Sequence, residues 1–316
     1  MAGICNTDLE ILGGYHAFRG TPGHEFVGEV AGLNTGSRAL RQKWLGQRVC
    51  GEINVSCSGY GYKPRCDLCR RGLERHCSRR SVLGIVNHDG AFAEYLTLPL
   101  ENLHMVPSNV SDEQAVFVEP LAAACEILDQ LNIAEFQQAA VLGDGKLAQL
   151  IARVLQSALG RQGARGAGSA SRGVVLYGKH PDKLALARSA GIATRKVRGD
   201  RTGPGRSRVR YRLLVEATGS PTGLALAEQL TEPRGTLVLK STFHGAAPVE
   251  TWPIVVNELT VLGSRCGPFG KAMALLSSGQ VDPKPLITRT FPLSAAPAAI
   301  RFAGRRSALK VLLLNR

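Results

Sequence analysis

The chain has 316 residues, of which 44% are hydrophobic and 20% charged, and its formal net charge is +14. At about 100–200 residues per domain this length predicts two domains, and the absence of any run of about 18 apolar residues excludes a membrane-spanning helix. Aromatic residues make up only 5% of the chain, which disfavours a base-stacking platform for nucleic acid. Solubility or attraction of a phosphate-bearing ligand explains the basic charge better, so we expect neither a nucleic-acid nor a membrane partner.

The first residues with metal-binding chemistry lie near the N-terminus. Cys5 offers a thiolate and His24 an imidazole, while Asp8 and Glu25 place carboxylates next to them in the sequence. Soft sulfur, borderline nitrogen and oxygen donors together are typical of zinc, and a catalytic zinc keeps one position open for water or substrate. A lone cysteine or histidine is more often a packing residue, so the pair indicates zinc only together with the later segments.

The sequence around these residues resembles segments of a known protein family. GICNTD at residues 3–8 and PGHEFVGEV at residues 22–30 are similar to the GICGTD and GHE segments of the zinc-dependent medium-chain dehydrogenase/reductase (alcohol dehydrogenase-like) family. The resemblance implies a catalytic zinc on Cys5 and His24 in a β-rich, GroES-like domain. It also implies that Thr7 passes the alcohol proton outwards and that Asp8 orients His24 from behind.

Four cysteines in the next segment form a second candidate zinc site. Cys66 and Cys69 form a C-x2-C pair, and Cys77 follows after seven residues, as in the last three members of the family's structural-zinc lobe. Cys57 would be the first member, displaced by an insertion, and Cys50 is the alternative. A longer loop is tolerated because the entropy of loop closure grows slowly with length. Reduced surface thiols are the simpler interpretation, and a thiolate cluster in either case implies a reducing compartment, hence the cytoplasm.

Further along, Glu119 begins an E-P-L sequence. The polyol and threonine dehydrogenase branch of the family carries the same three residues, with its glutamate at or beside the catalytic zinc. The resemblance therefore implies Glu119 as the third zinc ligand, with Glu25 as its competitor. A glutamate before a proline is also an ordinary way to start a helix.

The pattern then changes to that of a nucleotide-binding fold. A buried strand at 139–142 is followed by G-x-G-x-x-A, in which the first glycine permits a tight turn and the second lets backbone N–H groups approach a pyrophosphate. The small last residue lets the following helix pack closely on the strand. The cofactor-binding residues predicted here are Gly143, Gly145, Lys146, Leu147 and Ala148.

The next strand, at 174–177, ends without the carboxylate that takes the ribose hydroxyls of NAD. Lys179 stands there instead, beside His180, and a cation in this place suits a 2′-phosphate, so the sequence favours NADP over NAD. Residues 213–219 resemble the family's fourth strand, which adds Thr218 and Gly219 to the predicted cofactor site.

The resemblance covers nearly the whole chain and implies its organisation. We expect a GroES-like catalytic domain at 1–125 with the structural-zinc lobe, a Rossmann doubly wound parallel α/β sheet at 126–263, and a return to the catalytic domain at 264–316. Two loops are expected, a Gly/Arg/Ser-rich insertion at 160–173 and a basic segment at 195–212. Family members carry opening strands before the segment that matches residues 3–8, which implies an N-terminally truncated chain with unpaired strand edges.

The predicted function is therefore reversible oxidation of an alcohol by an enzyme that uses zinc and NAD or NADP. The substrate would be a polyol, an amino alcohol or a simple secondary alcohol, oxidised to a ketone or aldehyde, and family members are homodimers or homotetramers. One alternative is a catalytically inactive relic that still binds a dinucleotide. Another is a basic four-cysteine zinc protein that binds nucleic acid, which needs one zinc where the enzyme needs two.

Overall fold

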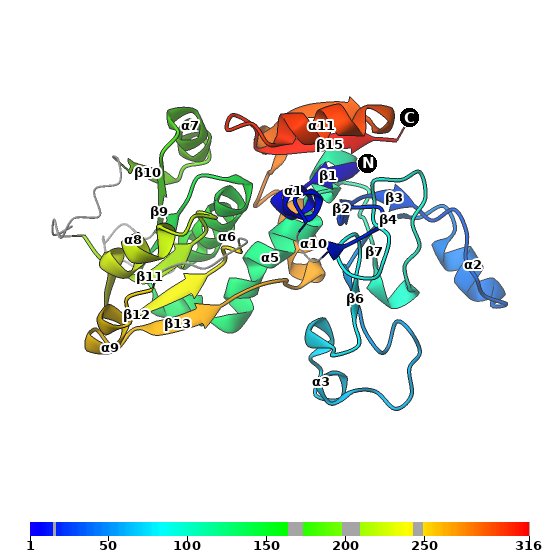
Figure 1. Ribbon diagram of the computed structural model, residues 1–316, viewed down its shortest axis with the longest axis horizontal. Coiled ribbons are helices and arrows are strands. Elements are labelled where there is room, and N and C mark those ends of the chain that lie inside the picture. Colours follow the sequence, from blue (N-terminus) through cyan, green and yellow to red (C-terminus); the bar gives the residue numbers. More distant parts are fainter. Residues whose placement is uncertain (15–16, 164–172, 198–208, 243–248, 316) are drawn as a thin grey trace. The chain divides into compact units, whose positions relative to one another are not determined.

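The structure, a computed structural model, describes residues 1–14, 17–163, 173–197, 209–242 and 249–315 (Figure 1). Most of the expected loops at 160–173 and 195–212 therefore lies outside the described residues. The chain forms two compact units, one made of residues 1–122 and 268–316 and the other of residues 123–267. The sequence placed these boundaries after residues 125 and 263.

The second unit is built on a six-stranded sheet in the order β10-β9-β8-β11-β12-β13, with all neighbouring strands parallel. This is the doubly wound Rossmann order, which reverses direction between its first and fourth strands, here β8 and β11. The fold class expected from the sequence is therefore confirmed. The strands are β8 (Gln138–Leu142), β9 (Gly173–Gly178), β10 (Ala193–Lys196), β11 (Tyr211–Glu216), β12 (Thr231–Leu239) and β13 (Thr260–Gly263). The helices are α6 (Lys146–Gly163), α7 (Pro181–Ser189), α8 (Gly223–Leu230), α9 (Trp252–Val256) and the 3-10 turn η4 (Ile133–Glu135).

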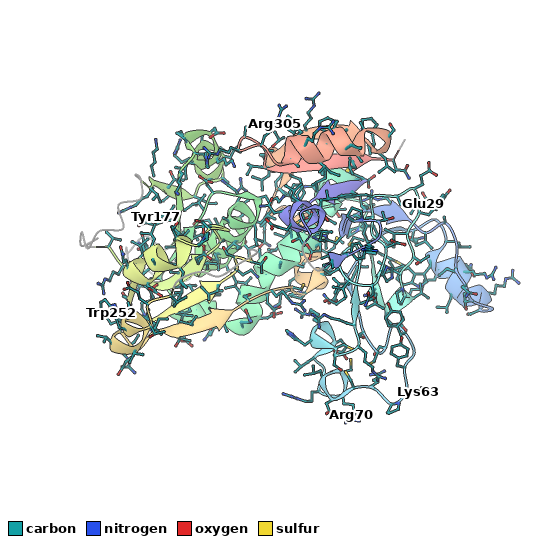
Figure 2. All side chains as sticks on the ribbon, in the orientation of Figure 1. Glu29, Lys63, Arg70, Tyr177, Trp252 and Arg305 are labelled. Atoms are coloured by element: carbon teal, nitrogen blue, oxygen red, sulfur yellow. The ribbon has the colours of Figure 1, made fainter. Side chains whose placement is uncertain are left out.

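Near-continuous apolar runs explain why these strands lie in the centre of the unit. A parallel sheet is covered on both faces by its crossover helices, so its strands read as apolar throughout. Ala140, Leu142, Leu214 and Leu237 are fully or almost fully buried in one cluster. In the same cluster the hydroxyls of Tyr177 and Tyr211 lie 3.0 Å apart, which satisfies both buried polar tips (Figure 2).

The first unit contains three small sheets, in the orders β14-β15-β1-β2, β3-β4-β7 and β5-β6. Its strands are β1 (Ala2–Ile4), β2 (Glu25–Phe26), β3 (Gly28–Glu29), β4 (Arg48–Gly51), β5 (Asn54–Val55), β6 (Ser81–Val82), β7 (Leu103–Met105), β14 (Ile287–Pro292) and β15 (Lys310–Leu314). Its helices are α1 (Asn6–Leu12), α2 (Arg38–Trp44), α3 (Asp67–Arg70), α4 (Asp112–Ala115), α10 (Phe269–Ser277) and α11 (Ala296–Ala303), with 3-10 turns η2 (Glu74–His76), η3 (Leu100–Asn102), η5 (Lys284–Leu286) and η6 (Leu293–Ala295). Helix α5 (Val118–Gln130) contains the boundary after residue 122.

Strand β1 is one of the two inner strands of the four-stranded sheet. It pairs antiparallel with β15 on one side, where Ile4 lies opposite Val311, and with β2 on the other, where Gly3 lies opposite Glu25. The last part of the chain therefore belongs to the same sheet as the first. None of the helices in the described ranges is long and apolar enough to cross a membrane.

Candidate metal and dinucleotide sites

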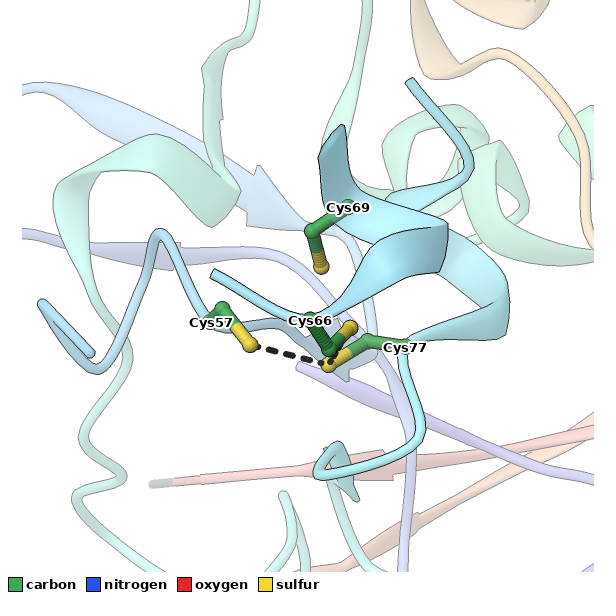
Figure 3. A group of neighbouring side chains, drawn as sticks. All are labelled: Cys57, Cys66, Cys69 and Cys77. Atoms are coloured by element: carbon green, nitrogen blue, oxygen red, sulfur yellow. Dashed lines mark hydrogen bonds between the residues drawn. The ribbon is translucent and has the colours of Figure 1, made fainter. Parts of the chain in front are cut away.

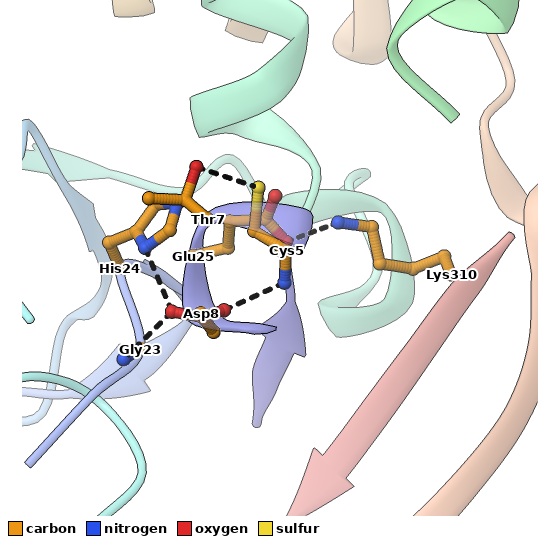
Figure 4. A network of polar contacts seen from close by, with 7 residues as sticks. All are labelled: Cys5, Thr7, Asp8, Gly23, His24, Glu25 and Lys310. Carbon is orange, nitrogen blue, oxygen red and sulfur yellow. Dashed lines mark hydrogen bonds and ion pairs between the residues drawn. The ribbon is translucent and has the colours of Figure 1, made fainter. Parts of the chain in front are cut away.

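The first candidate site forms where β1 ends and β2 begins (Figure 4). Cys5 follows β1 directly and is the N-cap residue of α1, and the antiparallel pairing of β1 with β2 brings His24 and Glu25 next to it. A Cβ atom at position 3 would overlap the Glu25 carboxylate, so the two strands approach this closely only because residue 3 is glycine. Local pairing thus joins two motifs that lie about twenty residues apart in the sequence.

Asp8 connects the two segments that form this site. Its carboxylate is fully buried and accepts hydrogen bonds from the backbone N–H of Cys5 at 2.7 Å and of Gly23 at 3.2 Å. The same carboxylate lies 3.2 Å from Nδ1 of His24. A carboxylate in this position fixes the orientation of the ring and leaves its other nitrogen to face a metal ion.

The electrostatics of His24 reflect the same contacts. Burial by itself lowers the pKa of this imidazole, but the Asp8 carboxylate and the Cys5 side chain outweigh burial and hold the pKa well above its ordinary value. The site therefore favours positive charge at the position of the ring. A cation bound there would satisfy the same negative groups.

Lys310 provides the countercharge to Glu25. It lies at the start of β15 with a fully buried side chain, and its ammonium group donates a hydrogen bond to Oε2 of Glu25 (Figure 4). The ammonium nitrogen also lies 5.3 Å from the centre of the Phe117 ring. The other Glu25 oxygen, Oε1, is buried without a hydrogen-bond partner. Buried polar atoms are rarely left unpaired, so this oxygen is suited to accept a ligand such as a cation.

Cys5, His24 and Glu25 form a group that could hold a metal ion, because one ligand atom from each lies within 4.8 Å of the others. A thiolate, an imidazole and a carboxylate are a donor set that zinc accepts, so these residues fit the ion. Thr7, in the first turn of α1, is half-buried, and its hydroxyl lies 3.8 Å from the Cys5 sulfur. Glu119 lies in the first turn of α5, half-buried, and is not a member of this group.

The second candidate metal site is the cysteine cluster (Figure 3). Sulfur atoms of Cys57, Cys66, Cys69 and Cys77 all lie within 4.8 Å of one another, with 3.5 Å between Cys57 and Cys77 and 3.7 Å between Cys66 and Cys77. Tetrahedral zinc with Zn–S bonds of about 2.3 Å requires sulfurs about 3.8 Å apart, so the four fit one ion. Cys50 is not in the cluster; it is buried in β4, which raises the pKa of its thiol to about 12.

The thiols of the cluster differ in pKa. Hydrogen bonds from the backbone N–H groups of Cys69 and Ser78 lower the pKa of Cys66 to about 5, whereas burial raises the pKa of Cys69 to about 12. A dication at the centre would stabilise all four as thiolates. The lobe that carries the cluster also bears Lys63 and Arg70 (Figure 2).

The glycine turn of the second unit follows β8 as the sequence predicted. Gly143 has φ +121°, and a Cβ atom there would overlap the carbonyl of Ala217. A Cβ at Gly145 would meet nothing within 4 Å, so the backbone is open to a ligand at that point. Helix α6 then begins at Lys146, with Leu147 half-buried and Ala148 fully buried against the sheet. The N-terminus of such a helix favours a phosphate.

Thr218 and Gly219 lie just beyond the end of β11. The Glu216 carboxylate accepts hydrogen bonds from the backbone N–H of Thr218 at 2.8 Å and from its hydroxyl at 2.5 Å. The N–H of Gly219 donates to the Ser241 hydroxyl at 2.8 Å. The loop is therefore fixed by side chains on both sides of the Thr218–Gly219 bond, at the edge where dinucleotides bind in this fold.

A buried carboxylate also lies at the end of β9, and it comes from the glycine turn. Asp144 accepts hydrogen bonds from the backbone N–H of Lys179 at 2.7 Å and of His180 at 2.8 Å, and both its oxygens lie 3.0 Å from Nδ1 of His180. Only Gly178 allows this approach, since a Cβ at that position would overlap Asp144. Lys179 is exposed and His180 half-buried.

Two residues of these sites were missed from the sequence. Lys310 precedes the apolar run of β15, and a lysine there was a weak signal of a buried charge. Asp144 occupies a variable position of the glycine fingerprint, which carries no signal. The N–H groups of residues 90–92 donate to the carbonyls of residues 21–23 and so support the loop that carries His24.

Known proteins that are similar to this chain are alcohol dehydrogenase-like enzymes. Residues 1–108 match the family model described as the alcohol dehydrogenase GroES-like domain. The 2-dehydro-3-deoxy-L-galactonate 5-dehydrogenase of Pseudoalteromonas atlantica is 27% identical over 98% of this chain and 88% of its own length. The alcohol dehydrogenase RspB of Escherichia coli CFT073, solved with NADH, is 27% identical with a TM-score of 0.84, covering 99% of this chain and 89% of that one. A protein of Sinorhizobium meliloti 1021 bound to NADP is 28% identical with a TM-score of 0.81, covering 99% and 90%.

The Lys310–Glu25 pair predicts a large loss of stability when its cation is removed. Replacing Lys310 by methionine leaves a buried carboxylate without its partner, which costs about 3–5 kcal/mol. We expect urea unfolding to show this loss for Lys310→Met and a recovery of most of it in the double variant Lys310→Met/Glu25→Gln. Lys284→Met, at an exposed lysine of the same unit, should match the wild type. An undiminished stability of Lys310→Met would show that the pair contributes nothing.

The cysteine cluster predicts one zinc that depends on Cys66. Elemental analysis of Cys66→Ser should find one zinc ion fewer per chain than in the wild type. Cys266→Ser, which changes a half-buried thiol outside the cluster, should keep the full content. The midpoint of thermal unfolding should fall by roughly 5 °C or more, because 1 kcal/mol corresponds to about 2–4 °C for a unit of this size. Unchanged zinc content in Cys66→Ser would exclude this site.

Proposed function

We propose that this chain, a member of the zinc-dependent medium-chain dehydrogenase/reductase family, is an NAD(P)-dependent dehydrogenase that reversibly oxidises a secondary alcohol to a ketone. The observation that carries the proposal is the convergence of Cys5, His24 and Glu25 on one point, with Asp8 behind the imidazole. The Pseudoalteromonas relative, which by its name oxidises a sugar acid at carbon 5, supports a polyol-like substrate. Amino alcohols and simple secondary alcohols remain within the proposed class.

The chemistry divides between the bound groups and the protein. When bound, zinc supplies a Lewis acid that lowers the pKa of the substrate hydroxyl, and the nicotinamide accepts the hydride that leaves the carbinol carbon. The balance is one alcohol and one oxidised nicotinamide giving one ketone, one reduced nicotinamide and one proton. The side chains of this protein hold the ion, orient its ligands and remove that proton.

Asp8 is proposed as a positioning residue for the metal site. It accepts from the backbone of both segments that carry the ligands and lies against Nδ1 of His24. The imidazole would then present Nε2 to a bound ion in one orientation.

Thr7 is proposed to carry the proton. Its half-buried hydroxyl stands beside the Cys5 sulfur, so it can accept the proton of a substrate hydroxyl held there and donate its own outwards. The net result is transfer of one proton from a shielded position towards solvent.

The third protein ligand is a carboxylate, and the geometry supports Glu25. Glu25 belongs to the group with Cys5 and His24, its Oε1 has no hydrogen-bond partner, and Lys310 binds Oε2 and fixes the side chain. Glu119, which the family resemblance favours, lies in the first turn of α5 and is not a member of the group.

Replacing Cys5 by serine tests the proposal. We expect kcat/KM for alcohol oxidation to fall by about 10²–10³-fold or more, because a Lewis acid contributes several kcal/mol and each 1.36 kcal/mol is tenfold in rate. One zinc per chain should be lost while the thermal midpoint and the dinucleotide affinity stay close to those of the wild type. Cys266→Ser is the control, and full activity in zinc-depleted Cys5→Ser would refute the zinc mechanism.

The two carboxylates are distinguished by the matched variants Glu25→Gln and Glu119→Gln. We expect the first to weaken zinc binding by about 10–100-fold in competition with a chelator, the range found when a group that supports a metal site is removed. The second should change it less than threefold. The reverse order would assign the ligand to Glu119.

A further inference from the structure

The carboxyl end of β9 differs from the arrangement that recognises NAD. In that arrangement a carboxylate at the end of the second strand accepts hydrogen bonds from the ribose hydroxyls. Here the buried carboxylate at this place is Asp144, which reaches β9 from the glycine turn. Its exposed fraction is 8%, and it already accepts from two backbone N–H groups and faces the imidazole of His180. Asp144 is therefore committed to the protein and is not available to a ribose.

Basic side chains surround this committed carboxylate. Lys179 is exposed directly after the strand, and His180 follows with its ring held through Nδ1, which leaves Nε2 for another partner. On the neighbouring strand β10, Lys196 is the register partner of Gly178, and it is exposed too. Two lysines and an imidazole thus meet at one edge of the sheet.

The acidic groups nearby do not cancel this arrangement. Asp182, in the first turn of α7, is exposed to solvent, where the interaction of charges is weak. Asp144 is already engaged by Nδ1 of His180 and by the backbone N–H groups of Lys179 and His180. A dianionic group that approached this edge would meet donors at three positions.

We propose that this edge binds the 2′-phosphate of NADP and that Asp144 is the positioning residue that holds Lys179 and His180 for it. This inference rests on the proposed function, since it assumes that a dinucleotide binds at the glycine turn. It goes further by assigning the preference between the two nicotinamide dinucleotides to Lys179, His180 and Lys196, with Asp144 holding the first two in place. The two lysines supply long-range attraction, and the fixed imidazole supplies a directed hydrogen bond.

The experiment is calorimetric titration of the zinc-loaded full chain with NADP⁺ and separately with NAD⁺, without an alcohol. We expect the wild type to bind NADP⁺ at least tenfold more tightly. Lys179→Gln and His180→Gln should each weaken NADP⁺ binding by about tenfold, the effect of losing one charge-assisted hydrogen bond, and leave NAD⁺ binding unchanged. Arg188→Gln, at an exposed residue in the last turn of α7, should change neither affinity.

Asp144→Asn separates positioning from direct contact. If Asp144 positions the phosphate-binding residues, this variant loses more affinity for NADP⁺ than for NAD⁺, and the preference shrinks. If Asp144 instead binds the ribose hydroxyls, NAD⁺ binding suffers more, which would overturn the inference. A general loss of folding would weaken both equally, and in that case the Lys179 and His180 variants decide.

The outcomes also separate this inference from the proposed function. Equal or tighter binding of NAD⁺ by the wild type would overturn the inference and leave an NAD-dependent dehydrogenase. An unchanged preference in both Lys179→Gln and His180→Gln would overturn it as well. Failure of both dinucleotides to bind would refute the proposed function itself.

Discussion

The metal site depends on one buried carboxylate. Asp8 has no exposed surface, and burying a charge is costly unless hydrogen bonds and nearby charges compensate it. Here the compensation comes from the N–H groups of Cys5 and Gly23 and from the imidazole of His24. The same contacts join the two segments that carry the proposed ligands. The stability of this corner of the fold and the geometry of the site therefore have a common cause.

The second unit also contains a buried aspartate that faces a histidine, here beside the proposed 2′-phosphate site. Asp144 is buried, accepts from the successive backbone N–H groups of Lys179 and His180, and faces the His180 ring. Asp8 is likewise buried and faces a histidine, but its two backbone donors lie in different segments. In each unit a short loop next to a strand is fixed by an aspartate from another segment: Asp8 fixes the loop at Gly23, and Asp144 fixes the loop at His180. Loops at the ends of strands carry function in such folds because a rigid scaffold holds them. An aspartate that holds both the loop and its histidine adds to that rigidity.

The sequence predicted well what depends on local spacing. The parallel sheet and the glycine turn followed from strand periodicity and a fixed fingerprint. The convergence of Cys57 with the other three cysteines followed from the resemblance to the family's structural-zinc lobe, since slow loop-closure entropy tolerates the longer loop. It missed what depends on distant pairing. Lys310 reaches Glu25 across 285 positions in the chain, and no pattern around either residue announces the contact.

The central claim is that one ion is held by Cys5, His24 and a carboxylate while another is held by four cysteines. Zinc X-ray absorption on the wild-type chain tests it most directly, since Zn–S bonds of about 2.3 Å are resolved from Zn–N and Zn–O bonds of about 2.0–2.2 Å. With two zincs per chain, the average shell should contain roughly 2.5 sulfurs, from four at one ion and one at the other, with a clear imidazole contribution. A shell of four sulfurs at a single zinc, with no imidazole signal, would contradict the account.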